Sequence, residues 1–368
     1  MATHYSNEYN LPGPVSEAIK FFDEVASGNL PVSRMCDAPQ ISYLRKRNDV
    51  EEDVSDKVWS MINRALIQVI ENGNPRARVL RALSVVSSHL HDVQSELRLS
   101  EDSSQASEYG LLASKLDELV LGSLPDDGWL IRQSMSVEVP YSVDMSKGFT
   151  HSGTTRVYDT IAMYEKASGT LYFPRVCSTA MYTKPQLRTG WIREANTQAT
   201  ILEFNGFEVK RIVCVMVYKD WHSSRAIKSD SYPLKQIDTV DFELKDFDTR
   251  EKFIRQRVAA HAMTEMGDIV ECKPADQWKR ADEYAVVRPG AKRPVIKKFL
   301  NRTDAEEHLQ RNRHMMTDAF VDIIPGERTR CEHYCSVREF CKQWEKERES
   351  TRTIQQLADD EMKRKGIK

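Results

Sequence analysis

The run Val209-Lys210-Arg211-Ile212-Val213-Cys214-Val215-Met216-Val217-Tyr218 decides the fold class of this chain. Nearly all of its residues are apolar, and β-branched valine and isoleucine are frequent. A continuous apolar run of this length is typical of a strand that is buried on both faces of a sheet, because a half-exposed strand would alternate with polar residues. The run therefore predicts a central sheet that is covered on both sides.

Strands and helices are predicted on both sides of this run. Apolar residues alternate with polar ones, or gather with Thr and Tyr, in the predicted strands, and they recur every three to four positions in the predicted helices. The elements are strands 130–143, 153–165 and 170–178, a hairpin turn at Lys166-Ala167-Ser168-Gly169, and helices 191–205 and 248–266. This order predicts an α/β fold with α+β elaborations and a mixed central sheet flanked by helices.

Three regions are predicted along the chain, a helical N-terminal region, an α/β core and a C-terminal region; they are 1–130, 131–266 and 267–368. The N-terminal region contains predicted helices over 15–25 and 53–71. A further helical stretch over 76–124, with a polar break in its middle, is interpreted as an insertion. The C-terminal region ends in a charged helix predicted over 336–364.

The composition is typical of a globular protein, with 40% hydrophobic and 29% charged residues among 368. The 53 Lys and Arg against 55 Asp and Glu give a net charge of −2, so any nucleic-acid surface must be a local patch. No apolar run approaches the ~20 residues of a membrane span, so no membrane partner is expected. Met1 to Leu11 is polar and does not resemble a signal peptide, and an intracellular location is therefore predicted.

Three of the seven cysteines form the pattern C-x3-C-x5-C, at Cys331, Cys335 and Cys341. Three thiols within eleven residues can converge on one soft metal centre, and both zinc and iron–sulfur sites require a fourth ligand. Cys272 is the best candidate for that ligand, with His333 and Cys36 as alternatives. The spacing alone does not distinguish zinc from iron–sulfur.

The remaining cysteines, Cys36, Cys177 and Cys214, are expected to be ordinary buried thiols. Disulfides are not expected, because the count is odd and the predicted compartment is reducing.

Several short segments carry a family resemblance through their order and spacing. They are Asn10-Leu11-Pro12, Ser33 to Arg47, Glu52 to Ser60, Ser152-Gly153-Thr154, Gly169 to Tyr172, Asn205 to Lys210, Lys219-Asp220-Trp221, Cys272, Trp278, Tyr284-Ala285-Val286 and the cysteine trio. In this order the chain resembles phage-encoded nucleases of the PD-(D/E)XK superfamily, in the RecB-like branch with a C-terminal iron–sulfur staple. The resemblance implies a restriction-endonuclease-like core and a 4Fe–4S cluster, rather than zinc, on the four cysteines 272, 331, 335 and 341.

The resemblance also implies a catalytic set that this chain lacks. Active members carry an acid on the second core strand, an acid and a Lys on the third, a His in an early helix and a Gln in the helix after the third strand. These acids bind Mg²⁺ or Mn²⁺, which activates water. The corresponding residues here are Arg156, Phe173, Arg175, Ile67 and Glu194. Because Arg and Phe cannot ligate Mg²⁺, the sequence predicts a nuclease fold with a silent site.

The alternative to a silent site is a catalytic site whose metal ligands lie at other positions. Glu71, Glu138 and Asp159 could together hold Mg²⁺ or Mn²⁺ and restore an active deoxyribonuclease. For Asp159 and Glu165 the favoured interpretation is a solvated charge near a strand end.

Five basic residues are predicted to contact DNA, because guanidinium groups bind phosphate without a metal. They are Arg156, Arg175, Lys184, Arg188 and Arg193. The alternative for Arg156 and Arg175 is an ion pair with a local acid such as Glu71 or Glu194.

Three functions remain open on the sequence. The leading hypothesis is a catalytically silent, phage-type iron–sulfur protein that binds single- or double-stranded DNA or a DNA-processing protein complex. The alternatives are an active Mg²⁺- or Mn²⁺-dependent deoxyribonuclease and a protein-interaction module, such as a virion component or an inhibitor of a host complex. A phage-encoded protein would act in the host cytoplasm or be associated with the virion.

Overall fold

The computed structural model describes residues 4–6, 29–53, 58–74, 128–288 and 295–350, with scattered positions between 77 and 115. These residues form two compact units. The first unit contains residues Asp37–Glu52 and the described chain from Ala260 onward. The second contains residues 29–36 and the described part of Asp53–Ala259.

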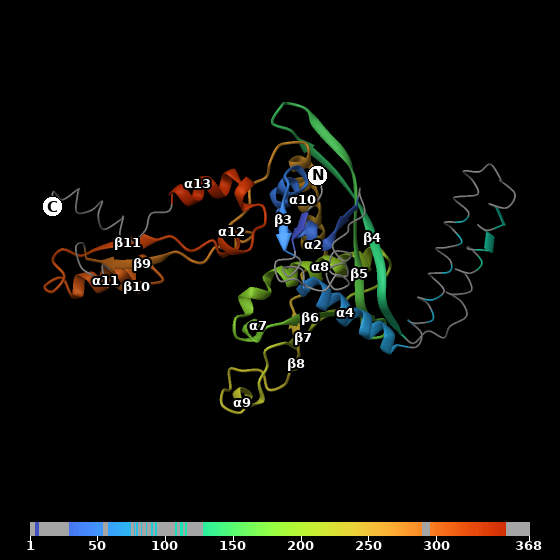
Figure 1. Ribbon diagram of the computed structural model, residues 1–368, viewed down its shortest axis with the longest axis horizontal. Coiled ribbons are helices and arrows are strands. Elements are labelled where there is room, and N and C mark those ends of the chain that lie inside the picture. Colours follow the sequence, from blue (N-terminus) through green and yellow to red (C-terminus); the bar gives the residue numbers. More distant parts are fainter. Residues whose placement is uncertain are drawn as a thin grey trace. The chain divides into compact units, whose positions relative to one another are not determined.

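The second unit is built around a mixed six-stranded sheet (Figure 1). Its strands are β2 (Asn29–Pro31), β4 (Trp129–Asp144), β5 (Thr150–Glu165), β6 (Thr170–Cys177), β7 (Arg211–Tyr218) and β8 (Ile237–Phe242). The order is β2-β5-β6-β7-β8, and β4 pairs with β5. The pairs β2–β5 and β6–β7 are parallel and the others are antiparallel. The α/β class and the mixed central sheet predicted from the sequence are confirmed.

The apolar run that indicated the sheet is its buried centre. Ile212, Cys214, Met216 and Tyr218 of β7 are fully buried between β6 and β8. Both faces of the strand are covered, as its uninterrupted apolar sequence predicts.

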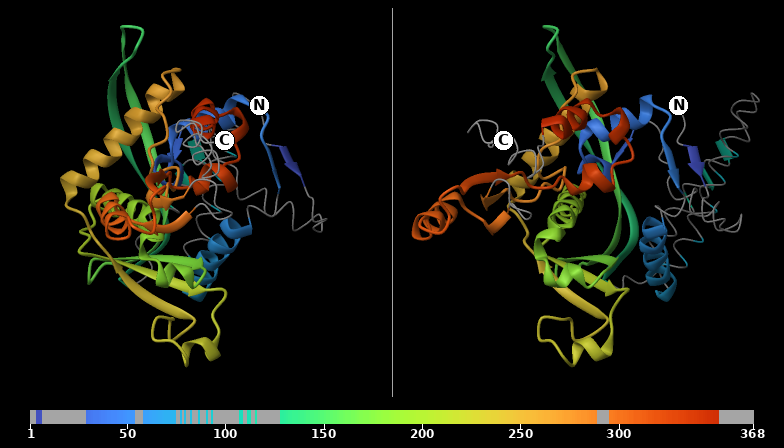
Figure 2. Two further views of the ribbon diagram at one scale, coloured as in Figure 1. Left: turned by 90° about the vertical axis from the view of Figure 1, so that its left-hand side faces the viewer. Right: turned by 60° about the vertical axis from the view of Figure 1, so that its left-hand side comes forward.

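Strands β5 and β6 diverge and leave a fork in the sheet. β5 pairs with β4 from Glu165 to Thr150, and Figure 2 shows this hairpin in green. On its other edge β5 pairs with β2 at residues 156–158 and with β6 at residues 163–165. The last β5–β6 pair is Met163–Tyr172. Beyond it, β6 runs on to Cys177 without β5, and the part of β5 from Thr150 to Ile161 remains paired with β4. We call the region beyond this pair the fork.

Helices flank the sheet. α8 (Thr189–Phe204) packs Ala195, Ala199 and Leu202 into the core that contains Ile161, Leu171 and Phe173. The first part of α10 (Phe247–Glu265) packs against β5 through Ile254 and Val258, in a core with Val139, Val157 and α2 (Val32–Met35). α4 (Val58–Gly73) lies beside β6 and β4.

The predicted strands and the helices over 191–205 and 248–266 are found within a few residues of their expected bounds. Of the helix predicted over 53–71, residues from Val58 onward form α4, whereas Asp53 belongs to strand β3 (Glu51–Asp53), which pairs with β1 (His4–Ser6). Strands β2 and β8 were not predicted. The helix predicted over 15–25, most of the insertion over 76–124 and the tail beyond residue 350 lie outside the described residues.

The first unit combines α3 (Pro39–Arg47) with the C-terminal part of the chain. A three-stranded antiparallel sheet has the order β10 (Val295–Phe299), β9 (Glu283–Val287), β11 (Phe320–Ile324), and α11 (Arg302–Arg311) packs on it. Next come α12 (Thr329–His333), the 3₁₀ turn η3 (Arg338–Phe340) and α13 (Lys342–Ser350). The charged helix predicted from residue 336 is therefore interrupted before Lys342.

Short turns complete the second unit: α7 (Ala180–Thr183), η2 (Pro185–Arg188) and α9 (Ser223–Ala226). Among the described helices, none is both long and apolar enough to cross a membrane.

Candidate functional site

Four cysteines of the first unit line one pocket. Cys331 lies in α12, Cys335 and Cys341 lie on either side of η3, and Cys272 lies seven residues past the end of α10. Local turns explain how two of them are brought close: the amide of Arg338 donates to the carbonyl of Cys335, and the amide of Cys341 donates to the carbonyl of Arg338. The structure thus brings together all four residues of the predicted ligand set. We call this site the cysteine pocket.

Amide groups position two of these thiols. Gln40 of α3 donates from Nε2 to Cys341 Sγ at 3.5 Å, and its Oε1 accepts from the Cys272 amide at 3.3 Å. The Trp344 amide also donates to Cys341 Sγ, at 3.4 Å. Gln343 forms paired hydrogen bonds with the backbone of Cys272, at 2.8 and 2.9 Å. N–H groups aimed at sulfur stabilise a thiolate over a thiol.

Burial alone would keep the four thiols protonated. It raises the pKa of each, to about 12 for Cys331, and the neighbouring cysteines raise the pKa of Cys272, Cys331 and Cys341 further. The guanidinium of Arg330 acts in the opposite direction on the pKa of Cys331. Arg330 is itself fixed by a bidentate pair with Asp37, at 2.5 and 2.7 Å. A bound metal would therefore displace protons from these sulfurs, as thiolate-ligated metals do.

The donor set fits a metal centre. Four soft sulfurs in one pocket suit zinc or an iron–sulfur cluster. With Zn–S bonds of about 2.3 Å, a tetrahedral zinc would require sulfurs roughly 3.8 Å apart. Among the described residues, the one group of three His, Cys, Asp or Glu ligand atoms within 4.8 Å of one another is Glu327, Glu332 and His333. No three of the four sulfurs are that close to one another.

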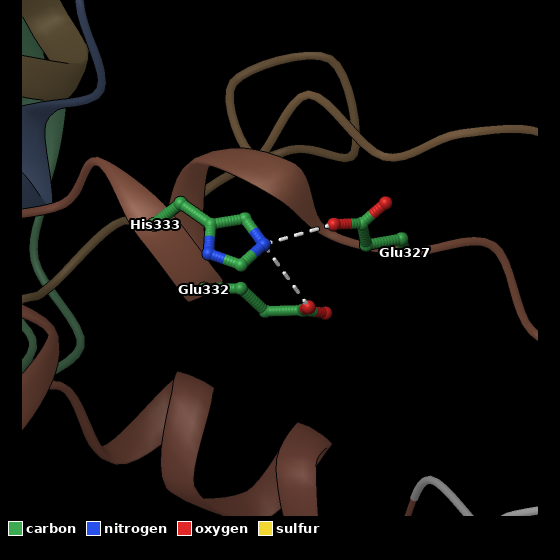
Figure 3. A group of neighbouring side chains, drawn as sticks. All are labelled: Glu327, Glu332 and His333. Carbon is green, nitrogen blue, oxygen red and sulfur yellow. Dashed lines mark hydrogen bonds and ion pairs between the residues drawn. The ribbon is translucent and has the colours of Figure 1, made fainter.

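Neither alternative fourth ligand lies in the cysteine pocket. His333 Nε2 faces Glu327 Oε1 at 3.0 Å and Glu332 Oε2 at 3.8 Å, on the exposed side of α12 (Figure 3). Cys36 belongs to the second unit, where its Sγ lies 3.7 Å from Thr197 Oγ1. Cys36, Cys177 and Cys214 are all buried, as predicted, and burial raises the pKa of Cys177 to about 11.

A second polar group lies at the fork of the central sheet. It consists of Asp159 from β5, Arg175 from β6, and Glu194 and Gln198 from α8. Gln198 Nε2 donates to Asp159 Oδ2 at 2.8 Å, and Arg175 Nη2 lies 2.7 Å from Glu194 Oε2. Because Glu194 and Gln198 are four residues apart, they lie on one face of α8. We call these four residues the fork cluster.

The carboxylate of Asp159 is partly buried and partly dehydrated. Loss of hydration is the largest effect on its pKa and raises it, and the charge of Glu194 raises it further. The hydrogen bonds from Gln198 and the Thr160 amide, together with Arg175, only partly compensate. The interpretation of Asp159 as a solvated strand-end charge was wrong, because Asp159 lies in the middle of β5 and faces α8. Glu165 does lie at the end of β5, where it accepts from Ser168.

The predicted DNA-contacting residues do not form one surface. Arg175 is paired with Glu194, and Arg188, only 8% exposed, donates to the carbonyls of Met181 and Tyr182. Arg156 is exposed, donates to Ser136 Oγ at 2.9 Å, and lies three residues from Asp159, hence on the opposite face of β5. The other two differ in exposure: Lys184 is exposed and Arg193 is partly buried.

The proposed relocated ligands are likewise separated. Glu71 of α4, 5% exposed, pairs with Arg132 at 2.5 Å. Glu138 is exposed and lies opposite Arg156 in the β4–β5 ladder, on the face away from Asp159.

The other two substituted positions serve packing. Phe173 is 1% exposed in the core of the sheet, and Ile67 is partly buried in α4.

Gln198, Gln40 and Arg330 were not predicted as site residues. Gln198 could have been found from its spacing of four residues from Glu194, in a helix whose buried side is otherwise mostly small or apolar. No local signal identifies Gln40, because its partners Cys272 and Cys341 are 232 and 301 residues away.

The sequence matches no protein-family model and no curated protein. Among solved structures, the crystal structure of SSO0001 aligns with 66% of this chain and 82% of its own, at 8% identity and a TM-score of 0.29. A similarity at this level carries no conclusion about fold or function.

Proposed function

We propose that this chain is an iron–sulfur protein on a RecB-like PD-(D/E)XK core, that its catalytic site is silent, and that it binds DNA or a DNA-processing protein complex. The convergence of Cys272, Cys331, Cys335 and Cys341 in the cysteine pocket carries the proposal. A 4Fe–4S cluster held there would join the segment after α10 to α12 and the start of α13. Structural metal centres of this kind contribute folding free energy directly.

The fork cluster supports the assignment of the core. An acid on one strand, Asp159, meets a helix that follows the next strand through Gln198. The family resemblance implies an acid and a Gln on these same two elements, although it places them at Arg156 and Glu194, three and four residues away from Asp159 and Gln198.

The charges of the fork cluster support a catalytically silent site. The one basic group, Arg175, neutralises Glu194, and the pKa of Asp159 is raised. A metal-activated water requires hard anionic oxygens that are free to bind the ion. Here one carboxylate is already engaged by a guanidinium.

Iron content tests the cysteine pocket. Protein purified without oxygen should contain iron and inorganic sulfide and show the visible absorption of an iron–sulfur cluster. Cys331→Ala should lose both, because three sulfurs cannot complete the ligand set. Cys36→Ala is the matched control and should retain them, since Cys36 lies outside the pocket. Stoichiometric zinc without iron would show that the cysteine pocket holds a zinc ion and not a cluster. The absence of both metals would refute the proposed metal centre.

A paired DNA assay tests the function. Labelled single- and double-stranded DNA would be incubated with Mn²⁺ for cleavage and with EDTA for binding, at low salt, where phosphate contacts are strongest. We expect binding without cleavage. Cleavage that is lost in Asp159→Asn would support the active-nuclease alternative. The absence of both activities would favour a protein partner.

A further inference from the structure

The fork cluster contains two acidic side chains but only one basic side chain. Asp159 and Glu194 provide two carboxylates, and Gln198 adds an amide oxygen, while Arg175 is the positive group in contact with Glu194. Arg175 and Glu194 also both act on the pKa of Asp159, so the three charges lie within electrostatic range of one another.

Gln198 is a buried acceptor without a donor. The residue is 5% exposed, and its Oε1 accepts no hydrogen bond from the described part of the chain. The orientation of the amide is set by Nε2, which must donate to the Asp159 carboxylate. A buried acceptor left unsatisfied destabilises the folded state. An ion or donor placed beside Oε1 would remove that destabilisation.

Arg175 is held in place by three neighbours. Its guanidinium pairs with Glu194, donates to the Pro174 carbonyl at 3.2 Å, and lies 3.7 Å from the centre of the Phe173 ring. Phe173 is itself fixed in the core, at 1% exposure. The guanidinium is therefore a fixed internal cation.

We propose that the fork cluster is a latent divalent-cation site, in which the guanidinium of Arg175 takes the place of a Mg²⁺ or Mn²⁺ ion that the oxygens of Asp159, Glu194 and Gln198 would otherwise hold. Carboxylate and amide oxygens are the hard ligands that these ions prefer. This inference rests on the proposed function, because it supplies the physical reason for the silent site.

Removing the guanidinium should open the site. Arg175→Met keeps an unbranched apolar side chain beside Phe173 but leaves two neighbouring carboxylates without a cation. Breaking a buried ion pair on one side is strongly destabilising, whereas neutralising both partners is not. Arg175→Met should therefore gain affinity for Mn²⁺, and Arg175→Met/Glu194→Gln should not.

The experiment measures Mn²⁺ binding by loss of the free-ion EPR signal, and thermal unfolding in EDTA, Mg²⁺ and Mn²⁺. All proteins carry His333→Ala, which disables the surface group of Glu327, Glu332 and His333. We expect Arg175→Met to bind one Mn²⁺ more than its parent and to unfold at a higher temperature with Mn²⁺ than with EDTA. The matched control Arg211→Met, which removes an exposed pair with Asp241, should behave like the parent.

Two outcomes would overturn the inference. One is that Arg175→Met shows no additional Mn²⁺ and no Mn²⁺-dependent rise in unfolding temperature, including the case in which it is unfolded in all three buffers. The other is that the Glu194→Gln double variant gains the same Mn²⁺ binding. Iron content, measured on the same samples, reports on the proposed function separately, so either proposal can fail while the other holds.

Discussion

Asp159 is an aspartate for which folding favours the protonated form. Because its folded-state pKa is raised above the ordinary value of 3.8, the native state binds this proton more tightly than the unfolded state does. The stabilisation from this group is therefore full below pH 3.8 and is lost as the pH rises above that value.

Asp159→Asn should remove this pH dependence. The amide can still accept from Gln198 Nε2, but it carries no charge to desolvate. We expect the variant to exceed the parent in free energy of unfolding at pH 7 and the difference to shrink as the pH approaches 4. Denaturant titrations across this range measure it. Asp230→Asn, at an exposed aspartate, is the control; a difference of the same pH dependence there would contradict the argument.

Residue spacing predicted one of the two sites. The C-x3-C-x5-C pattern identifies three residues of the cysteine pocket because helix α12 and turn η3 are local structures, and Cys272 was the best candidate for a fourth ligand. The fork cluster was predicted only in part, through Arg175 and its pairing with Glu194 as an alternative. The role of Asp159 could not be inferred from its own neighbours, because α8 determines which of its atoms meet water.

At the scale of elements, α4 supports the open edge of β6. Beyond Tyr172 this edge no longer pairs with β5, and Asn63 of α4 accepts from the Val176 amide at 2.8 Å. A strand edge without a ladder partner needs such an acceptor. Alternation along β5 and β6 predicted the strands but not their divergence, because pairing depends on both strands at once.

Asn63→Ala should destabilise the second unit by about 1–2 kcal/mol, because it removes the side-chain acceptor of this amide. Asn63→Asp keeps an acceptor oxygen and should recover most of the loss. Chemical denaturation measures both. Val69→Ala, also in α4 but at a residue 66% exposed, should have little effect, and an equal loss there would indicate a general effect on the helix.

A second element-scale contact joins α12 to the segment before α3. Arg330→Met should cost about 2 kcal/mol, because Asp37 loses its bidentate partner while it stays largely buried. Adding Asp37→Asn should restore most of the stability. The exposed helical pair of Arg302 and Glu306 provides the comparison, and Arg302→Met should change stability by less than about 0.5 kcal/mol. Equal losses in the two variants would argue against a special role for Arg330.

At the scale of the whole molecule, the cysteine pocket belongs to one unit only. Removing the proposed cluster with an iron chelator should therefore unfold or loosen the first unit and leave the second folded. Hydrogen exchange should show lost protection in residues 37–47 and 320–350, with β6 and β7 unchanged. Uniform loss of protection across both units would show that they unfold together.

The first unit is assembled from two distant parts of the chain. Gln40 can accept its hydrogen bond from the Cys272 amide only after Cys272, 232 residues later, has been synthesised. At synthesis rates of about 5–20 residues per second, this delay is roughly 10 to 50 seconds on the ribosome. The intervening strands and helices can fold during that time. A cluster could then be loaded into the cysteine pocket only late in biosynthesis, after Cys341 has been synthesised.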